Sequence, residues 1–224
     1  MARGLQPWGP IGTMRWLSTD YELLDRWRDG DAEAGNDLFR RHFSAVYRFF
    51  RDKVHGEADE LIQATFLACV RARDQFRKDC SFRAFLFTLA RHELYRYFRH
   101  KASSADLDFS VTSLADMGPS PSRLLELDQR RARLVRAVRR LPLQQQLLIE
   151  LHYWEDMRPA ELAQVFEIAE PTARVWLFRA RKALRTQLEN SGAAPTQEPE
   201  ADDLDAWVQD IRQQGRDSGE EHGA

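Results

Sequence analysis

Residues 58–101 decide the fold of this chain and read ADELIQATFLACVRARDQFRKDCSFRAFLFTLARHELYRYFRHK. In the first part of this stretch, apolar residues stand at positions 58, 61, 62, 66, 69 and 70, which is the spacing of one stripe along a helix. The second part, over 82–100, repeats that period and places Leu86, Leu89, Ala90, Leu94 and Tyr97 on one side. Because no alternation with a period of two persists anywhere in the chain, the sequence predicts an all-α protein.

The opposite face of the predicted 82–100 helix combines positive charge with an aromatic ring and lacks any carboxylate. Successive helical residues are about 100° apart, so this face carries Thr88, Arg91, His92, Tyr95 and Arg99. Between residues 71 and 101, nine lysines and arginines outnumber three acidic residues, and seven aromatic residues lie among them. A solvated helix face is the ordinary interpretation of such charges, but this combination favours phosphates and unstacked bases as ligands.

A polar loop precedes this helix and lies between two phenylalanines, Phe76 and Phe82. Its residues are Arg77, Lys78, Asp79, Cys80 and Ser81. A short loop that is flanked by aromatic rings and lies beside a basic helix is suited to hold a flipped-out base. We therefore include the two rings in a predicted single-strand binding site.

Charge is distributed unevenly along the 224 residues. The net charge is −2, but residues 190–224 carry nine acidic residues and two arginines, so this tail holds −7 and the preceding residues hold +5. A basic folded part favours a polyanionic partner. The tail and residues 1–18 are expected to be largely disordered, and Met14 is an alternative start to Met1.

The sequence predicts no membrane span, secretory signal, metal site or cofactor. No apolar run approaches the 18 or so residues that cross a bilayer, and the Gly- and Pro-rich N-terminus lacks the apolar core of a signal peptide. Cys69 and Cys80 have the spacing of neither a zinc site nor a disulfide framework. These absences favour a reducing cytoplasm.

The helical segments group into two units that are joined by a flexible linker. Helices that begin near Thr19 or Asp20, after Asp31, and at 58 and 82 form a first unit over residues 19–101. Residues 102–125 are rich in Ser, Gly and Pro and form the predicted linker, although some of their apolar side chains are expected to dock. Helices resume in a second unit over residues 126–189.

The second unit contains the pattern of a helix-turn-helix. A short helix opens at Pro159, a turn follows over 167–169, and a basic helix opens at Pro171. Helical spacing places Ala173, Leu177, Ala180 and Leu184 on the inner side of that basic helix. Its outer side is expected to carry Thr172, Arg174, Val175, Phe178, Arg179 and Lys182. Such a helix either reads bases in the major groove of DNA or contacts phosphates alone.

Both units, in this order, resemble the extracytoplasmic-function (ECF) sigma factors of bacterial RNA polymerase. Region two of that family is similar to about 20–101, and region four is similar to 126–189. The resemblance is carried by Ala58-Asp59-Glu60-Leu61-Ile62-Gln63-Ala64-Thr65-Phe66, by the run from Phe85 to Arg99, and by Leu141-Pro142, Glu161-Leu162-Ala163 and Thr172 to Arg181. This chain departs from the usual residues of the family at Phe85, His92, Arg96, Arg158 and Glu167, where Trp, Asn, Asp, a capping Ser and a turn Gly are usual.

The resemblance implies a function in transcription initiation, with core RNA polymerase and promoter DNA as partners and an anti-sigma factor as a candidate third. It implies polymerase binding by Asp59, Glu60 and Gln63, and recognition and melting of the −10 element by Phe76, Arg77, Lys78, Ser81, Phe82, Thr88, Arg91, His92, Tyr95 and Arg99. Recognition of the −35 element is implied for the six outer residues of the basic helix, and the linker is expected to thread toward the RNA exit path. The expected location is the cytoplasm, in association with the nucleoid.

Two other functional classes fit the sequence less well. A helix-turn-helix regulator that acts without polymerase explains the second unit but gives the aromatic and basic surface of the first unit no function. An enzyme such as a nuclease is disfavoured because the sequence predicts no paired carboxylates at a shared pocket and has no Gly-rich phosphate loop. Run-off transcription with core polymerase separates a sigma factor from a repressor.

Overall fold

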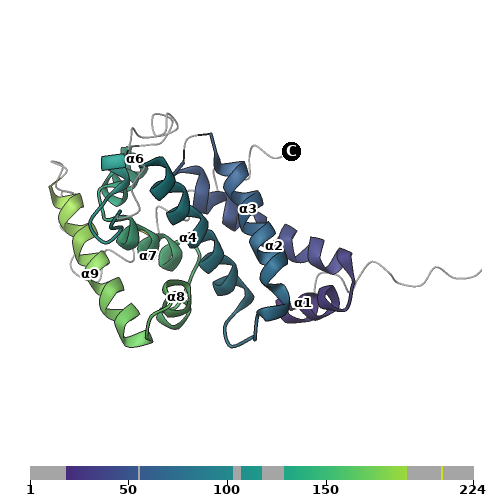
Figure 1. The fold of residues 1–224 in the computed structure, drawn as a ribbon. Coiled ribbons are helices and arrows are strands. Elements are labelled where there is room, and N and C mark those ends of the chain that lie inside the picture. The colour runs from purple at the N-terminus through teal and green to yellow at the C-terminus, as the bar shows by residue number, and fades with distance from the viewer. Residues whose placement is uncertain (1–18, 55, 103–106, 118–128, 191–207, 209–224) are drawn as a thin grey trace, which may run out of the picture.

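The computed structural model describes residues 19–54, 56–102, 107–117, 129–190 and 208. Most of these residues lie in helices, which turns and short loops connect (Figure 1). The helices are α1 (Asp20–Arg28), α2 (Ala32–Arg51), α3 (Ala58–Ala72), the 3-10 helix η1 (Arg73–Gln75), α4 (Phe82–Lys101), α5 (Leu114–Met117), α6 (Gln129–Arg139), α7 (Leu143–Tyr153), α8 (Pro159–Phe166) and α9 (Glu170–Glu189). In this part of the chain the only β-type pairing is an isolated bridge between Ser113 and Pro142. The all-α prediction is confirmed.

Side-chain caps fix where the helices of the first unit begin. The Thr19 hydroxyl accepts a hydrogen bond from Glu22 N, and the Glu22 carboxylate accepts one from Thr19 N, which completes a capping box on α1. The carboxylate of Asp31 accepts hydrogen bonds from two backbone amides at the start of α2. The hydroxyl of Ser81 accepts one from Ala84 N at the start of α4. These polar residues therefore fix the positions at which α1, α2 and α4 begin.

The core of the first unit lies between α1, α2, α3 and α4, which pack on one another in chain order. Its fully buried side chains include Leu23, Leu24, Leu38, Val46, Phe50, Cys69, Leu86 and Leu94. α1 and α2 approach closely at Gly35, where an added Cβ would lie 2.7 Å from two atoms of the Trp27 ring. The Trp27 ring also packs edge-on against Phe39 and lies beneath Arg73, so it has little room to move.

Replacing Gly35 with alanine is expected to lower the free energy of unfolding by about 1–2 kcal/mol. Alanine favours a helix over glycine, but the clash with the Trp27 ring outweighs that gain. Urea unfolding followed by circular dichroism measures the change. The exposed Asn36, one position along α2, is the control because Asn36→Ala meets no such contact. A Gly35→Ala protein as stable as the wild type would contradict the close approach.

The second unit is organised around α9, which packs on α6, α7 and α8. As predicted, the inner side of α9 carries the buried residues Ala173, Leu177, Ala180 and Leu184. Pro159 occupies the first turn of α8, where its missing amide costs nothing. The turn between α8 and α9 is tight, since Ile168 N donates to Ala163 O at 2.9 Å. The helix-turn-helix geometry is therefore present.

Part of the linker packs on the folded units. Phe109 and Leu114 are buried, whereas Val111 is 69% exposed. The amide of Gln144 donates to Phe109 O, and the amide of Leu143 donates to Thr112 O, so the linker backbone caps the start of α7. Residues 107–117 are thus held in place, in line with the expectation that some apolar side chains of the linker dock. The predicted disordered segments 1–18 and 191–224 lie outside the described residues, except for Val208, which is fully buried in the hydrophobic core.

The two units pack against each other through α4 and α8. Figure 1 shows α4 with α2 and α3 on one side and α7 and α8 on the other. The contact brings the start of the helix-turn-helix against the helix that was expected to bind single-stranded DNA. We call the contacts that residues of the first unit make with α7, α8, Glu155 and Glu167 the closed interface.

Candidate nucleic-acid and partner interfaces

The outer face of α9 is exposed to solvent. Val175 and Phe178 are 46% and 68% exposed, and Arg179 and Lys182 are also exposed. Arg174 Nη2 donates to Glu170 Oε1 at 2.5 Å one turn earlier, so a competing phosphate has to displace that carboxylate. Thr172 is half-buried near the start of the helix. The six residues expected on this face lie together, and their arrangement suits insertion into a DNA groove.

The residues expected at the −10 element fall into exposed and covered groups. Arg77, Lys78, His92 and Arg99 are exposed. Lys78 is held toward α1, because its Nζ lies 2.6 Å from Asp25 Oδ2 and also lies over the ring of Tyr21. The side chains of these four residues remain in contact with solvent in the present arrangement.

Phe76 and Phe82, whose rings were expected to hold an unstacked base, are core residues in this structure. They are only 6% and 1% exposed, and both pack against Phe85. Phe82 also packs on the ring of His42. The three phenylalanine rings pack on one another, and Phe76 and Phe82 flank the loop at residues 77–81. Helical periodicity did not reveal that these rings are buried. Two rings that flank a polar loop are compatible both with a site that holds a base and with a core.

Arg91 is buried in the closed interface, although its helical position predicted an exposed residue. Its guanidinium lies between the ring of Tyr95 at 5.4 Å and the ring of Phe166 in α8 at 5.7 Å. Its Nη2 donates to Glu167 Oε2 at 2.5 Å. The first unit therefore supplies the arginine, and the second supplies both a ring and a carboxylate.

Thr88 and Tyr95 are also covered. The hydroxyl of Thr88 donates to Ala84 O at 2.9 Å within α4 and lies 3.5 Å from Gln164 O of α8. The ring of Tyr95 stacks on Phe109 of the linker with centroids 4.1 Å apart, and the guanidinium of Arg99 lies over the ring of Phe109. Burial raises the pKa of Tyr95, against the opposing influence of Arg91 and Arg99. The central part of the predicted −10 surface is thus occupied by the chain itself.

Further ion pairs cross the closed interface, and sequence reasoning did not find them. Glu155 accepts hydrogen bonds from Arg48 Nη2 at 2.9 Å and from Arg83 Nη2 at 3.2 Å. Lys53, with a buried ammonium, pairs with Glu150. The hydroxyl of Ser81 donates to Glu161 Oε1 at 3.1 Å. The partners are separated by 72 to 107 residues in three of these hydrogen bonds, so no local pattern links them.

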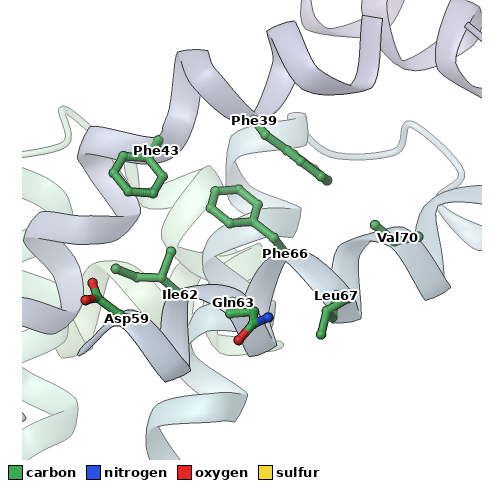
Figure 2. A pocket seen from close by; sticks show the side chains of 8 residues that line it. All are labelled: Phe39, Phe43, Asp59, Ile62, Gln63, Phe66, Leu67 and Val70. Atoms are coloured by element: carbon green, nitrogen blue, oxygen red, sulfur yellow. The ribbon is translucent and has the colours of Figure 1, made fainter. Parts of the chain in front are cut away.

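A separate apolar groove lies between α2 and α3, away from the closed interface. Figure 2 shows side chains of both helices around it, and the lining residues are Phe39, Phe43, Asp59, Ile62, Gln63, Phe66, Leu67 and Val70. Phe43, Leu67 and Val70 are 48%, 47% and 40% exposed. Asp59 and Gln63, two of the predicted polymerase-binding residues, line the groove, and the third, Glu60, is exposed beside them. Exposed apolar residues with a polar rim are typical of a protein docking site.

Two further kinds of site were sought among the described residues. They contain no group of His, Cys, Asp and Glu that could hold a metal ion, and none of their helices is long and apolar enough to cross a membrane. Both cysteines are free. Burial raises the pKa of Cys69 to about 12 and, together with Asp79, that of Cys80 to about 11, so both thiols are protonated at neutral pH.

Comparison with known proteins gives two family matches. Residues 38–104 match Sigma-70 region 2, and residues 131–184 match Sigma-70, region 4. The chain is 25% identical over 181 residues to the ECF RNA polymerase sigma-E factor of Escherichia coli K12, with 76% of this chain and 95% of that protein covered. It is 31% identical over 171 residues to the ECF RNA polymerase sigma factor BldN of Streptomyces coelicolor, with coverage of 73% and 63%.

A solved structure shares the fold. CnrH, determined in complex with the cytosolic domain of CnrY, aligns with a TM-score of 0.54 and 24% sequence identity. The alignment covers 78% of this chain and all of CnrH. The order of the two helical units therefore has a precedent in an experimental structure.

Proposed function

Because this chain belongs to the ECF family of RNA polymerase sigma factors, we propose that it binds core RNA polymerase and directs promoter recognition, DNA melting and transcription initiation. The observation that carries the proposal is the presence of both sigma regions in one chain, with an open groove on the first and an exposed basic helix on the second. A DNA-binding regulator without polymerase leaves the groove without a function. The protein acts as an initiation factor and supplies no catalytic group of its own.

The groove between α2 and α3 is the proposed contact with core polymerase. Its apolar floor suits the apolar face of a partner helix, and its rim carries the acidic residues Asp59 and Glu60. A basic or amphipathic helix of the polymerase fits both properties. Gln63 lines the groove beside Asp59 and is placed to hydrogen-bond such a helix.

The exposed cations around α4 are the proposed contacts with the −10 element. Arg77, Lys78, His92 and Arg99 bind phosphates of the separated strand. Arg91 offers a guanidinium on which a base stacks once α8 moves away, and Tyr95 offers a ring once Phe109 of the linker also moves away. Stacking on protein groups, at about 1–3 kcal/mol per base, offsets the duplex stacking that melting loses. Phe76 and Phe82 are buried at the two ends of the loop at residues 77–81 and anchor it to the core.

The outer face of α9 is the proposed reader of the −35 element. Val175 and Thr172 suit contacts with thymine methyl groups, and Arg179 suits bidentate hydrogen bonds to guanine. We place the protein in the cytoplasm, associated with the nucleoid through these contacts. Run-off transcription with purified core polymerase tests the proposal as a whole: the protein is expected to start transcription at defined promoters, and failure with every promoter and core enzyme supplied would refute it.

Arg179→Ala is expected to weaken binding to a −35 duplex by roughly 1–3 kcal/mol, a loss of about 5- to 150-fold. The guanidinium is exposed on α9 and its removal leaves the packing of the helix intact. Fluorescence anisotropy with the mapped −35 duplex measures the affinity. Arg136→Ala, an equal loss of charge at an exposed site on α6, is the control. Equal affinities for the two variants would remove Arg179 from the recognition set.

A further inference from the structure

Two departures from the usual sigma-factor residues meet in space. Glu167 follows α8, and His92 lies on α4, 75 residues away in the sequence. His92 Nε2 lies 2.9 Å from Glu167 Oε2, and Arg91 Nη2 donates to that same oxygen at 2.5 Å. One carboxylate oxygen of the second unit thus contacts two adjacent cationic or polar groups of the first.

The backbone of Glu167 favours a glycine. Its φ of 57° and ψ of 44° lie in the left-handed region, where a Cβ is sterically disfavoured. The peptide is held there because the amide of Glu167 caps α8 by donating toward Ala163 O and Gln164 O. A glutamate at this position therefore costs conformational free energy relative to glycine. What it adds in place of the glycine is a carboxylate.

The carboxylate of Glu167 is ionised in this setting. Partial burial alone would raise the pKa of Glu167, but the hydrogen bond and charge of His92 and the charge of Arg91 together lower it. Glu167 is still 58% exposed at its side chain, whereas Arg91 is 11% exposed. The interaction therefore joins a buried arginine to a carboxylate at the edge of the closed interface, where solvent and salt reach it.

The same pattern recurs along the closed interface. Carboxylates of the second unit, Glu150, Glu155 and Glu167, each face a cation of the first unit. Glu155 alone contacts Arg48 and Arg83. Because Arg91 and His92 belong to the surface proposed for the −10 strand, Glu167 occupies part of that surface.

We propose that Glu167 is an intramolecular latch: it pairs with Arg91 and His92 to hold the helix-turn-helix unit over the −10 surface, so that the free protein binds single-stranded DNA poorly until the units separate. The inference rests on the proposed function for the identity of the masked surface. Glu155 reinforces the latch through its two arginines. Separation of the two units removes both Phe166 and Glu167 from Arg91 and thereby exposes its guanidinium.

The test compares the full-length wild type with Glu167→Gly and with Glu155→Gln/Glu167→Gly. Glycine fits the left-handed backbone, so the first variant is expected to fold at least as well as the wild type. Small-angle X-ray scattering measures the radius of gyration. Fluorescence anisotropy measures affinity for a labelled single-stranded DNA of roughly 12 nucleotides of mixed sequence, without polymerase. Glu189→Gln, an equal loss of charge at an exposed end of α9, is the control.

We expect Glu167→Gly to increase the radius of gyration and to bind the oligonucleotide about fivefold more tightly, with a larger change in the double variant and none beyond the charge effect in Glu189→Gln. Unchanged dimensions in both variants would refute the latch. Larger dimensions without tighter binding would refute the claim that the latch masks the DNA surface. These two measurements use no polymerase, so a failure of the wild type in run-off transcription counts against the proposed function separately.

Discussion

Leu67→Asp is expected to abolish detectable association with core RNA polymerase and, with it, promoter-dependent transcription. Leu67 lines the groove between α2 and α3 and is 47% exposed, so the leucine contributes little to the core and much to a docking surface. A carboxylate at this position meets the apolar face of the partner helix, so binding removes its hydration without supplying a counter-charge. A loss of at least about 100-fold in affinity, some 2.7 kcal/mol, is the expected result.

Surface plasmon resonance with immobilised core polymerase measures the affinity of the Leu67→Asp protein, and run-off transcription measures the consequence. Asn36→Asp is the matched control, because it adds the same charge to an exposed position on α2 outside the residues that line the groove. Thermal unfolding of both variants checks that the fold is intact. If Leu67→Asp bound core polymerase as tightly as the control, the groove would not be the docking site.

Elements whose sequence pattern is local were predicted well. The inner side of α9, with Ala173, Leu177, Ala180 and Leu184, was found from helical spacing alone, because one side of that helix is buried and the other faces solvent. Thr19 was one of two candidates for the cap of α1, and it forms the cap with Glu22. In each case the residues that decide the structure lie within a few positions of one another.

Elements that depend on long-range packing were not predicted. Helix α4 has the bundle on one side and α8 on the other, so a residue such as Arg91 that points away from the first core is still buried. Helical periodicity identifies the direction of a side chain but not what covers it. The acidic partners Glu155 and Glu167 come from the second unit, and their own neighbours in sequence give no sign of the pairing.

The aromatic residues near the loop at 77–81 illustrate the same limit. Counting rings and cations identified a surface that is rich in both, and Tyr95 and Arg91 do lie together there. Phe76 and Phe82 were assigned to the same surface, but they are part of the core. The sequence does not distinguish a ring that awaits a base from a ring that packs on Phe85, because both stand beside polar residues.

Phe82→Ala is expected to lower the free energy of unfolding by about 3–5 kcal/mol. The ring is 1% exposed and packs on His42, Phe76 and Phe85, so its removal leaves a cavity where the start of α4 meets α2. Such a loss is a large fraction of the 5–15 kcal/mol that is typical of a folded domain. Urea unfolding followed by circular dichroism measures it, with Phe178→Ala as the control because that ring is 68% exposed.

The two functions that a phenylalanine can have at this position give opposite results. A ring that stacks on an unpaired base is exposed in the free protein, so its loss would leave stability unchanged and would reduce only promoter opening. A core ring supports the fold, so its loss reduces promoter opening in proportion to the unfolded fraction, and lower temperature restores it. If the Phe82→Ala protein had wild-type stability and a defect only in promoter opening, Phe82 would belong to the DNA-binding surface. Because its ring is buried, we expect the loss of stability instead.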